Sequence, residues 1–276
     1  MRLNVLCVAF LLVVLAAWPA GAQRNGTAAI ETKTRAAVLA VSIDKKLKFD
    51  PALVANLAAE GRRFVAKMRA EADDEYKSDQ GYFRGGRRYS YQRGYAFRSL
   101  VAGRYLSIVR DDSTYTGGAH PNSRLDTILW DSAQKKRISV RPFFNETADD
   151  GPTMTALAAL VRRAVTIERQ ERREGPLNEI EKKEFLAKLD ETIAKDEQLK
   201  ETIQPRLLKL GPISLAPSTT AGKSSGLTLH FSPYDVDAYA AGPYTVFVPW
   251  TDLKPFLSAE GIAIFAGDRP AKDNEL

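Results

Sequence analysis

The sequence predicts an α+β protein in which helices pack on antiparallel sheets, arranged as two small adjoining sub-domains. Three observations lead to this class. An apolar stripe with helical spacing follows Asp50-Pro51, and residues 89–97 alternate between aromatic or basic side chains and small or polar ones. Strand-like segments then return after a charged, helical middle. The chain therefore begins with a strand, a helix and an antiparallel meander, and closes with more strands.

The first 22 residues have the features of a signal peptide. Arg2 gives a basic start, residues 5–17 form an apolar run, and Ala20-Gly21-Ala22 is a typical cleavage site. The run of about 13 residues is short for a membrane span, and no later run is apolar enough to span a membrane. The single cysteine, Cys7, lies in this segment, so the mature chain has no disulfide or thiol nucleophile. We predict a periplasmic or secreted protein without an integral membrane segment after cleavage.

The first domain is assigned to residues 36–140 from the spacing of its apolar residues and from the capping and turn residues between them. Residues 23–35 are polar and without period, which predicts a flexible leader before a strand at 36–43. Asp50 is a good N-cap and Pro51 a good first residue for a helix of about 25 residues, ending near residues 73–75. Further strands are predicted at residues 89–98, 100–115, 125–130 and 137–140.

The second domain is assigned to residues 141–257. Pro152 opens a helix that breaks at Gly175-Pro176, and residues 178–203 predict one or two solvated, charged helices. Three strands follow, and Thr251 is the predicted N-cap of a short final helix. Residues 258–276 are predicted to hold an edge strand and a disordered tail; the predicted strands are 207–216, 227–231, 244–249 and the edge strand 262–265.

Net charge limits the classes of partner. The chain carries a formal charge of +6, or about +5 without Arg2, which favours anionic surfaces such as envelope polymers. Residues 81–98 are rich in Arg, Gly and aromatic side chains, a composition also found in proteins that bind single-stranded nucleic acid. Their alternation with period two instead predicts a strand with an aromatic face and a basic rim. Export also argues against nucleic acid, so we expect no such partner.

One candidate site is a histidine-bearing corner between two strands. Gly117-Gly118 allows positive φ, and Pro121 restricts His120 to an extended conformation. A histidine held in this way is a hydrogen-bonding corner post, a ligand or a general base. The candidate binding residues of this loop are Tyr115, Gly117, Gly118, His120 and Asn122.

A second candidate loop, residues 233–242, combines tyrosines with acidic residues. Aromatic side chains beside carboxylates are typical of protein-binding hot spots. The alternative is that the tyrosines only cover the core. The candidate residues of this loop are Tyr234, Asp235, Asp237 and Tyr239.

These two loops, followed by Val246-Phe-Val-Pro249 and Leu253, resemble the paired secreted domains of RsiV-type anti-sigma factors and the N-terminal region of PdaC-type peptidoglycan deacetylase. The resemblance implies an α+β fold. It implies direct binding of lysozyme, as in the anti-sigma factors, or a module that accompanies a separate catalytic domain, as in the deacetylase. We expect the binding module alone here. Because lysozymes are commonly basic, steering toward this basic chain would need locally clustered acidic residues.

Catalytic alternatives have little support in the residue types. His120 and His230 are the only histidines, and neither H-x-x-x-H nor H-x-H spacing suggests a metal site with Asp111 or Asp112. Ser113 is not on a nucleophile elbow. We therefore predict no metal, no cofactor and no catalytic residues.

Three hypotheses follow: a binding module for a protein or a peptidoglycan-type polymer, a cell-wall hydrolase or deacetylase using His120, and an accessory protein that binds another surface protein. The first requires loops 117–122 and 233–242 to lie exposed on one rim of the sheet. The second requires His120 to face a deep polar pocket with acids or a nucleophile. The third requires a large apolar patch without a concave site.

Overall fold

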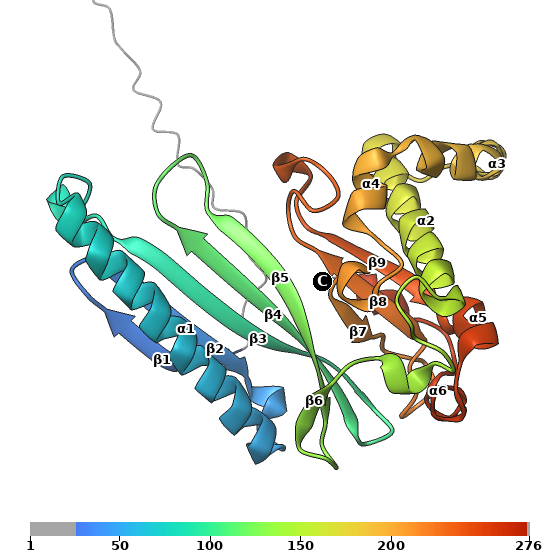
Figure 1. Cartoon of the computed structure of the whole chain (residues 1–276), viewed down its shortest axis with the longest axis horizontal. Coiled ribbons are helices and arrows are strands. Elements are labelled where there is room, and N and C mark those ends of the chain that lie inside the picture. The colour runs from blue at the N-terminus through green and yellow to red at the C-terminus, as the bar shows by residue number, and fades with distance from the viewer. Residues whose placement is uncertain (1–25, 275–276) are drawn as a thin grey trace, which may run out of the picture.

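The computed structural model describes residues 26–274, so the predicted signal peptide at residues 1–22 lies outside them. Two sheets face each other, and a long helix covers the outer face of each (Figure 1). The order of the layers is helix α1, the six-stranded sheet, the three-stranded sheet and helix α2. This arrangement confirms the predicted α+β class. The predicted domain boundary at residues 140–141 stays a prediction, since the two sheets pack directly on each other.

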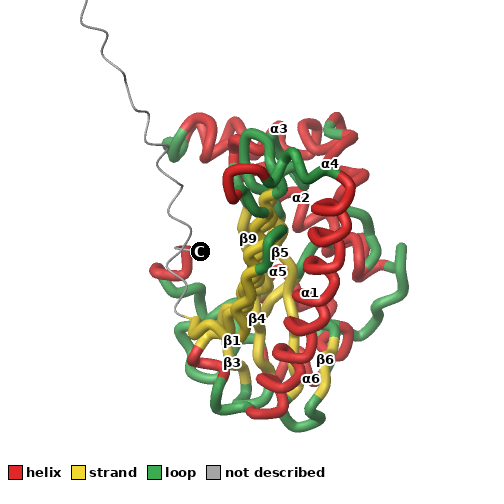
Figure 2. Tube along the Cα trace, turned by 90° about the vertical axis from the view of Figure 1, so that its left-hand side faces the viewer, coloured by secondary structure: helices red, strands yellow, loops and turns green. Residues whose placement is uncertain are grey.

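The first sheet contains six strands in sequence order. Neighbouring strands are antiparallel except β2 and β3, which are parallel. The exception arises because α1, Pro51–Ser78, connects these two strands as a crossover helix and lies along one face of the sheet (Figure 2). The strands are β1 Gly26–Lys33, β2 Ala37–Asp44, β3 Tyr89–Val101, β4 Tyr105–Tyr115, β5 Asn122–Asp131 and β6 Lys136–Ile138.

Helix α1 begins as predicted. The Asp50 side chain accepts a hydrogen bond from the Leu53 amide at 2.9 Å, and proline occupies the first turn. Leu53 and Leu57 are fully buried against Tyr95 and its neighbours on the sheet. The aromatic face predicted for residues 89–97 is the face that packs beneath this helix.

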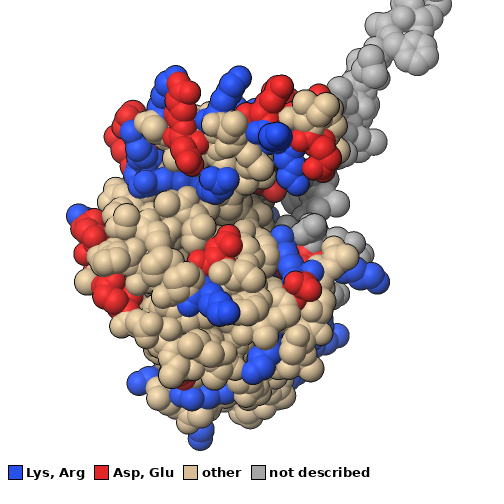
Figure 3. Space-filling view, turned by 90° about the vertical axis from the view of Figure 1, so that its right-hand side faces the viewer, with Lys and Arg blue, Asp and Glu red and all other residues tan. Residues whose placement is uncertain are grey.

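The second sheet has the order β7-β8-β9, and α2 covers its outer face. The charged segment predicted at residues 178–203 is helical and lies at one end of the molecule, where Lys, Arg, Asp and Glu gather (Figure 3). The elements are α2 Pro152–Glu174, α3 Glu179–Lys195, α4 Glu197–Thr202, β7 Ile213–Leu215, β8 Gly226–Phe231, β9 Tyr244–Pro249, α5 Trp250–Leu253 and α6 Ala259–Ile264.

Two predictions about the first sheet were wrong. Residues 26–33 of the predicted flexible leader form strand β1, which pairs with β2 from Gly26↔Asp44 to Lys33↔Val38. Because β1 is an edge strand, pairing on one side needs no strong apolar pattern. Residues 100–115 are not continuous strand, since Ala102 and Gly103 adopt φ of 52° and 62° and turn the chain between β3 and β4.

Three predictions about the C-terminal region were also wrong. The expected edge strand at residues 262–265 falls largely in α6, because the Ser258 hydroxyl caps the Gly261 amide at 3.1 Å. Pro249, not Thr251, occupies the N-cap of α5. The tail from Gly267 was expected to be disordered, but Asp273 is buried and its Oδ2 accepts from the Arg98 guanidinium at 2.6 Å.

The layer between the two sheets is polar. The Ser99 hydroxyl donates to the Leu215 carbonyl at 2.7 Å, and the Leu215 amide donates to the Ser107 hydroxyl at 3.0 Å. Arg98 also donates to the Thr228 hydroxyl at 3.1 Å. Paired hydrogen bonds of this kind offset the cost of burying polar groups, and they fix the register of one sheet on the other.

His230 is part of this layer and is only 2 % exposed, so it is a packed strand residue. Its Nε2 lies 2.9 Å from the Ser214 hydroxyl. Burial lowers the pKa of His230 to about 3, and the positive charges of Arg98 and Arg269 act in the same direction against Asp273. The imidazole is therefore neutral in the folded protein at neutral and mildly acidic pH.

Replacement of this histidine should change how stability depends on pH. Below pH 6.5 His230 becomes protonated in the unfolded chain, whereas in the folded chain it stays neutral down to about pH 3. The free energy of unfolding therefore falls as the pH is lowered through this range. Between pH 6.5 and 4.5 this contribution amounts to about 2 kcal/mol. Urea titrations at several pH values should show a shallower slope for His230→Gln than for the wild type. Equal slopes would contradict a neutral, buried His230.

Candidate functional site

The two candidate loops meet at one rim of the molecule. The His120 ring stacks on the Tyr239 ring with 3.7 Å between centroids and 18° between planes. The Tyr239 hydroxyl donates to the Pro121 carbonyl at 2.6 Å. These contacts join the β4–β5 turn of the first sheet to the β8–β9 connection of the second. We call the side chains Tyr115, His120, Tyr234 and Tyr239 the aromatic loop surface.

Local geometry holds the β4–β5 turn in shape. Gly117 and Gly118 adopt φ of 102° and 99°, a region that other residues rarely occupy. A Cβ on Gly117 would lie 3.0 Å from the Tyr82 ring, so the ring packs closely on the backbone there. The Tyr115 hydroxyl donates to the Gly118 carbonyl at 3.1 Å, and His120 Nδ1 lies 3.1 Å from the Pro121 carbonyl.

The aromatic residues of the second loop are presented to solvent. Tyr234 has φ of 74° and is 59 % exposed, and its ring lies 5.3 Å from that of Tyr239. A non-glycine residue in the left-handed region is uncommon. Tyr239 is half-buried beneath it. The two tyrosines therefore differ: Tyr234 is exposed, whereas Tyr239 packs against the other loop.

The acidic residues of this loop instead maintain its conformation. Asp235 accepts from the Ser232 amide at 2.7 Å, and the Ser232 hydroxyl accepts from the Leu125 amide of the first sheet at 3.0 Å. Asp237 accepts from the Tyr244 hydroxyl at 2.7 Å and from Arg173 at 3.2 Å. The carboxylates of Asp235 and Asp237 therefore do not join the tyrosines in one surface for a partner.

The pKa of Asp237 reflects this internal role. Burial raises the pKa of its carboxyl, but hydrogen bonds from Tyr244 and the Ala238 amide, together with Arg173, outweigh burial and leave the pKa below its usual value. The charge is thus compensated within the protein. The locally clustered acidic surface that would steer a basic partner does not form at this loop.

Asn122 is the one candidate that points elsewhere. It pairs with Thr114 across the β4–β5 ladder and lines a groove of about 440 Å³ beside α1. Tyr115 is adjacent to Thr114 and so projects from the opposite face of the sheet. The groove and the aromatic loop surface therefore lie on opposite faces of the same hairpin.

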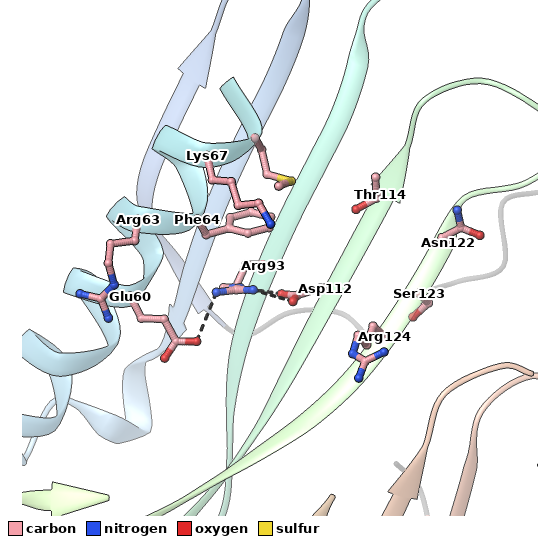
Figure 4. A pocket seen from close by; sticks show the side chains of 11 residues that line it. Glu60, Arg63, Phe64, Lys67, Arg93, Asp112, Thr114, Asn122, Ser123 and Arg124 are labelled. Atoms are coloured by element: carbon pink, nitrogen blue, oxygen red, sulfur yellow. Dashed lines mark hydrogen bonds and ion pairs between the residues drawn. The ribbon is translucent and has the colours of Figure 1, made fainter. Parts of the chain in front are cut away.

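Sequence analysis missed this groove, in which α1 contributes one wall and β3, β4 and β5 contribute the floor (Figure 4). Arg93 lies at its centre, with Nε and Nη2 each 2.6 Å from a carboxylate oxygen of Asp112. The guanidinium also stacks over the Phe64 ring at 4.2 Å. One signal was visible in the sequence, because Arg93 is the only charged member of the aromatic face formed by residues 89–97.

Glu60 of α1 is the centre of the ion pairs beside this groove. Its carboxylate accepts from Arg93 at 3.2 Å, from Arg110 at 2.5 Å and from Arg137. Burial raises the pKa of the Glu60 carboxyl, but Arg137 and, to a smaller extent, Arg110 lower it by more, so the pKa lies below its usual value. Glu60 is therefore ionised at neutral pH and binds side chains from β3, β4 and β6.

The surroundings of His120 lack the elements of a hydrolytic site. Its recorded hydrogen-bond partner is the Pro121 carbonyl, with no carboxylate or nucleophile among its contacts in residues 26–274. Within that range, no group of three or more His, Cys, Asp or Glu side chains could hold a metal ion. No helix in the described part of the chain is long and apolar enough to cross a membrane.

Comparison with known proteins finds a described family whose model matches part of the chain. A family model described as "Protein of unknown function (DUF3298)" matches residues 152–251, from the start of α2 into α5. The matched region includes Tyr234, Asp235, Asp237 and Tyr239 but not the β4–β5 turn. No curated protein matches the chain.

Two solved structures of that family are similar over most of the chain. A DUF3298 family protein from Pseudomonas aeruginosa PAO1 is 14% identical with a TM-score of 0.46, covering 86% of this chain and 90% of its own. A member from Bacteroides fragilis NCTC 9343 is 18% identical with a TM-score of 0.43, covering 86% and 97%. The resemblance to RsiV-type and PdaC-type proteins stays a prediction.

Loss of one hydroxyl should loosen the joint between the loops. Tyr239→Phe removes the hydrogen bond to the Pro121 carbonyl and keeps the stack on His120. We expect faster amide hydrogen exchange in residues 116–121, by roughly fivefold, because a net hydrogen bond contributes about 1 kcal/mol. Tyr234→Phe is the matched control, since the Tyr234 hydroxyl has no recorded bond, and it should leave exchange unchanged. Unchanged exchange in Tyr239→Phe would contradict the joint.

Proposed function

We propose that this protein is a non-catalytic binding module of the cell envelope that recognises a lysozyme-like protein or a cell-wall polymer through the aromatic loop surface. The observation that supports it most is the stack of His120 on Tyr239. It assembles one exposed surface from two loops that lie far apart in the sequence. Ordering two loops against each other costs conformational entropy. A role in recognition would explain why the chain keeps this arrangement.

The residue types on this surface suit binding. Tyr234 is a large, rigid side chain with a polar end, the kind that is enriched at binding hot spots. It needs little ordering on contact, because Tyr239 and His120 beneath it are already fixed. The resemblance to secreted lysozyme-sensing domains and to the deacetylase module supports the same function.

The hydrolase alternative needs His120 to act as a base. Its ring is stacked on Tyr239, and within residues 26–274 its polar contact is the Pro121 carbonyl, with no carboxylate or nucleophile in reach. This hypothesis also requires His120 to face a deep polar pocket, whereas the groove of about 440 Å³ is not lined by His120 and lies on the opposite face of the hairpin. These observations favour binding over turnover.

Binding should be measured for immobilised lysozyme by interferometry and for insoluble peptidoglycan by co-sedimentation. We expect binding to one of the two, weakened about thirtyfold in Tyr234→Asn, since a hot-spot side chain contributes about 2 kcal/mol. Asparagine tolerates positive φ, so this variant removes the ring without straining the loop.

Ile180→Ala is the matched control, because Ile180 is a large side chain that is 72% exposed on α3, and it should bind like the wild type. Muropeptides incubated with the wild-type protein should remain intact. Hydrolysis that disappears in His120→Ala would replace the binding function with a catalytic one, and absence of binding to both probes would also contradict the proposal.

A further inference from the structure

We propose that the groove between α1 and strands β3–β5 is a second binding site, independent of the aromatic loop surface, for a short stretch of a carboxylate-bearing sugar chain. The site lies on the face of the β4–β5 hairpin that carries Thr114 and Asn122 (Figure 4). Tyr115 projects from the opposite face. Its volume of about 440 Å³ falls within the range of small-ligand sites and suits a few linked rings rather than a protein surface.

The first argument is the sign of the charge that the groove presents. Four basic and two acidic side chains line it, and both acids are already paired. Asp112 binds Arg93 through both carboxylate oxygens, and Glu60 binds three arginines. The charge left facing solvent is therefore positive.

The second argument is that the remaining cations have weak or no partners. Arg63 and Arg124 are exposed and form no ion pair with another residue of the described chain. Lys67 has Glu71 at 3.7 Å, but both side chains are more than half exposed, so this pair is weak. Lys67 projects from α1 and Arg124 from β5, on opposite sides of the groove (Figure 4). An acidic ligand lying across the floor would thus meet a cation on each side.

The third argument concerns the uncharged lining, which matches a sugar ring. The side chains of Thr114 and Asn122 make no hydrogen bond with other described residues, so their donors and acceptors are free for ligand hydroxyls. Phe64 and Met68 provide apolar surface on which the C–H face of a ring can pack. A simple inorganic anion would use the cations but not this part of the lining.

The fourth argument is that the floor is rigid before any ligand arrives. Arg93 is held by Asp112 and Glu60 and is stacked on Phe64, so the position of the floor is set by the fold. A preformed site avoids the entropy of ordering long side chains on binding. The exposed cations Arg63, Lys67 and Arg124 are the side chains that the ligand would have to order.

Calorimetry with trigalacturonate as the probe tests this site. The wild-type protein should bind it, and the fully methyl-esterified trisaccharide, which has the same rings without charge, should bind at least tenfold more weakly. Lys67→Gln and Arg124→Gln should each weaken binding of the acid by roughly tenfold. Because both side chains are exposed, neither change should unfold the protein, which circular dichroism will verify.

Arg62→Gln is the matched control, since Arg62 is an exposed neighbour on α1 that lines no part of this groove, and it should bind within about twofold of the wild type. Tyr234→Asn should also bind trigalacturonate normally, which separates failure of this site from failure of the aromatic loop surface.

Four results would overturn the proposal: no binding of trigalacturonate at millimolar concentration, equal affinity for the ester, equal loss in Arg62→Gln, or equal affinity for triglutamate or inorganic phosphate. The last would show a general anion surface, whether for acidic peptides or for phosphate, instead of a site for sugar chains.

Discussion

The structure depends on one carboxylate, Glu60, that joins the long helix to three strands. Arg93, Arg110 and Arg137 come from β3, β4 and β6, and each donates to this side chain. Without a compensating negative charge, arginines brought this close beneath a helix would repel one another and pay for desolvation. With the Glu60 carboxylate present, the three arginine side chains are held in fixed positions, as the apolar side chains are by packing.

The consequence is a sheet face divided along its strands. Toward one end of the strands, side chains such as Leu106 and Ile108 pack against α1. Toward the other end the same face carries Arg93 and Asp112, which form the floor of the groove. The opposite face packs on the second sheet through a polar layer. Toward its turn, the β4–β5 hairpin carries the groove on one face and the aromatic loop surface on the other.

Much of the local structure could be predicted from the sequence because its causes are local. The N-cap at Asp50 and the aromatic alternation around Tyr95 act over a few residues, and the structure confirms both. The two candidate loops could be named from their residue types. Their contact through His120 and Tyr239 was a requirement of the binding hypothesis that no local signal demonstrated.

What could not be predicted depends on partners distant in the sequence. Asp273 looked like part of a disordered tail because its partner, Arg98, lies 175 residues away. Asp237 looked like part of an acidic contact surface, because Arg173, which uses one of its oxygens, lies 64 residues away. The groove required the position of α1 relative to β3, which periodicity does not specify.

The pH dependence of stability in Glu60→Gln tests the central role of this carboxylate most directly. At pH 7 we expect the variant to lose about 2–4 kcal/mol of unfolding free energy, because the three arginines lose a buried anionic partner. The net pKa of Glu60 lies below 4.5, so its contribution should be complete above that pH and should fade as pH falls through the lowered pKa. The two proteins should then converge in acid. The central role of Glu60 would be contradicted if the variant were as stable as the wild type at pH 7. It would also be contradicted if the difference in unfolding free energy did not change with pH.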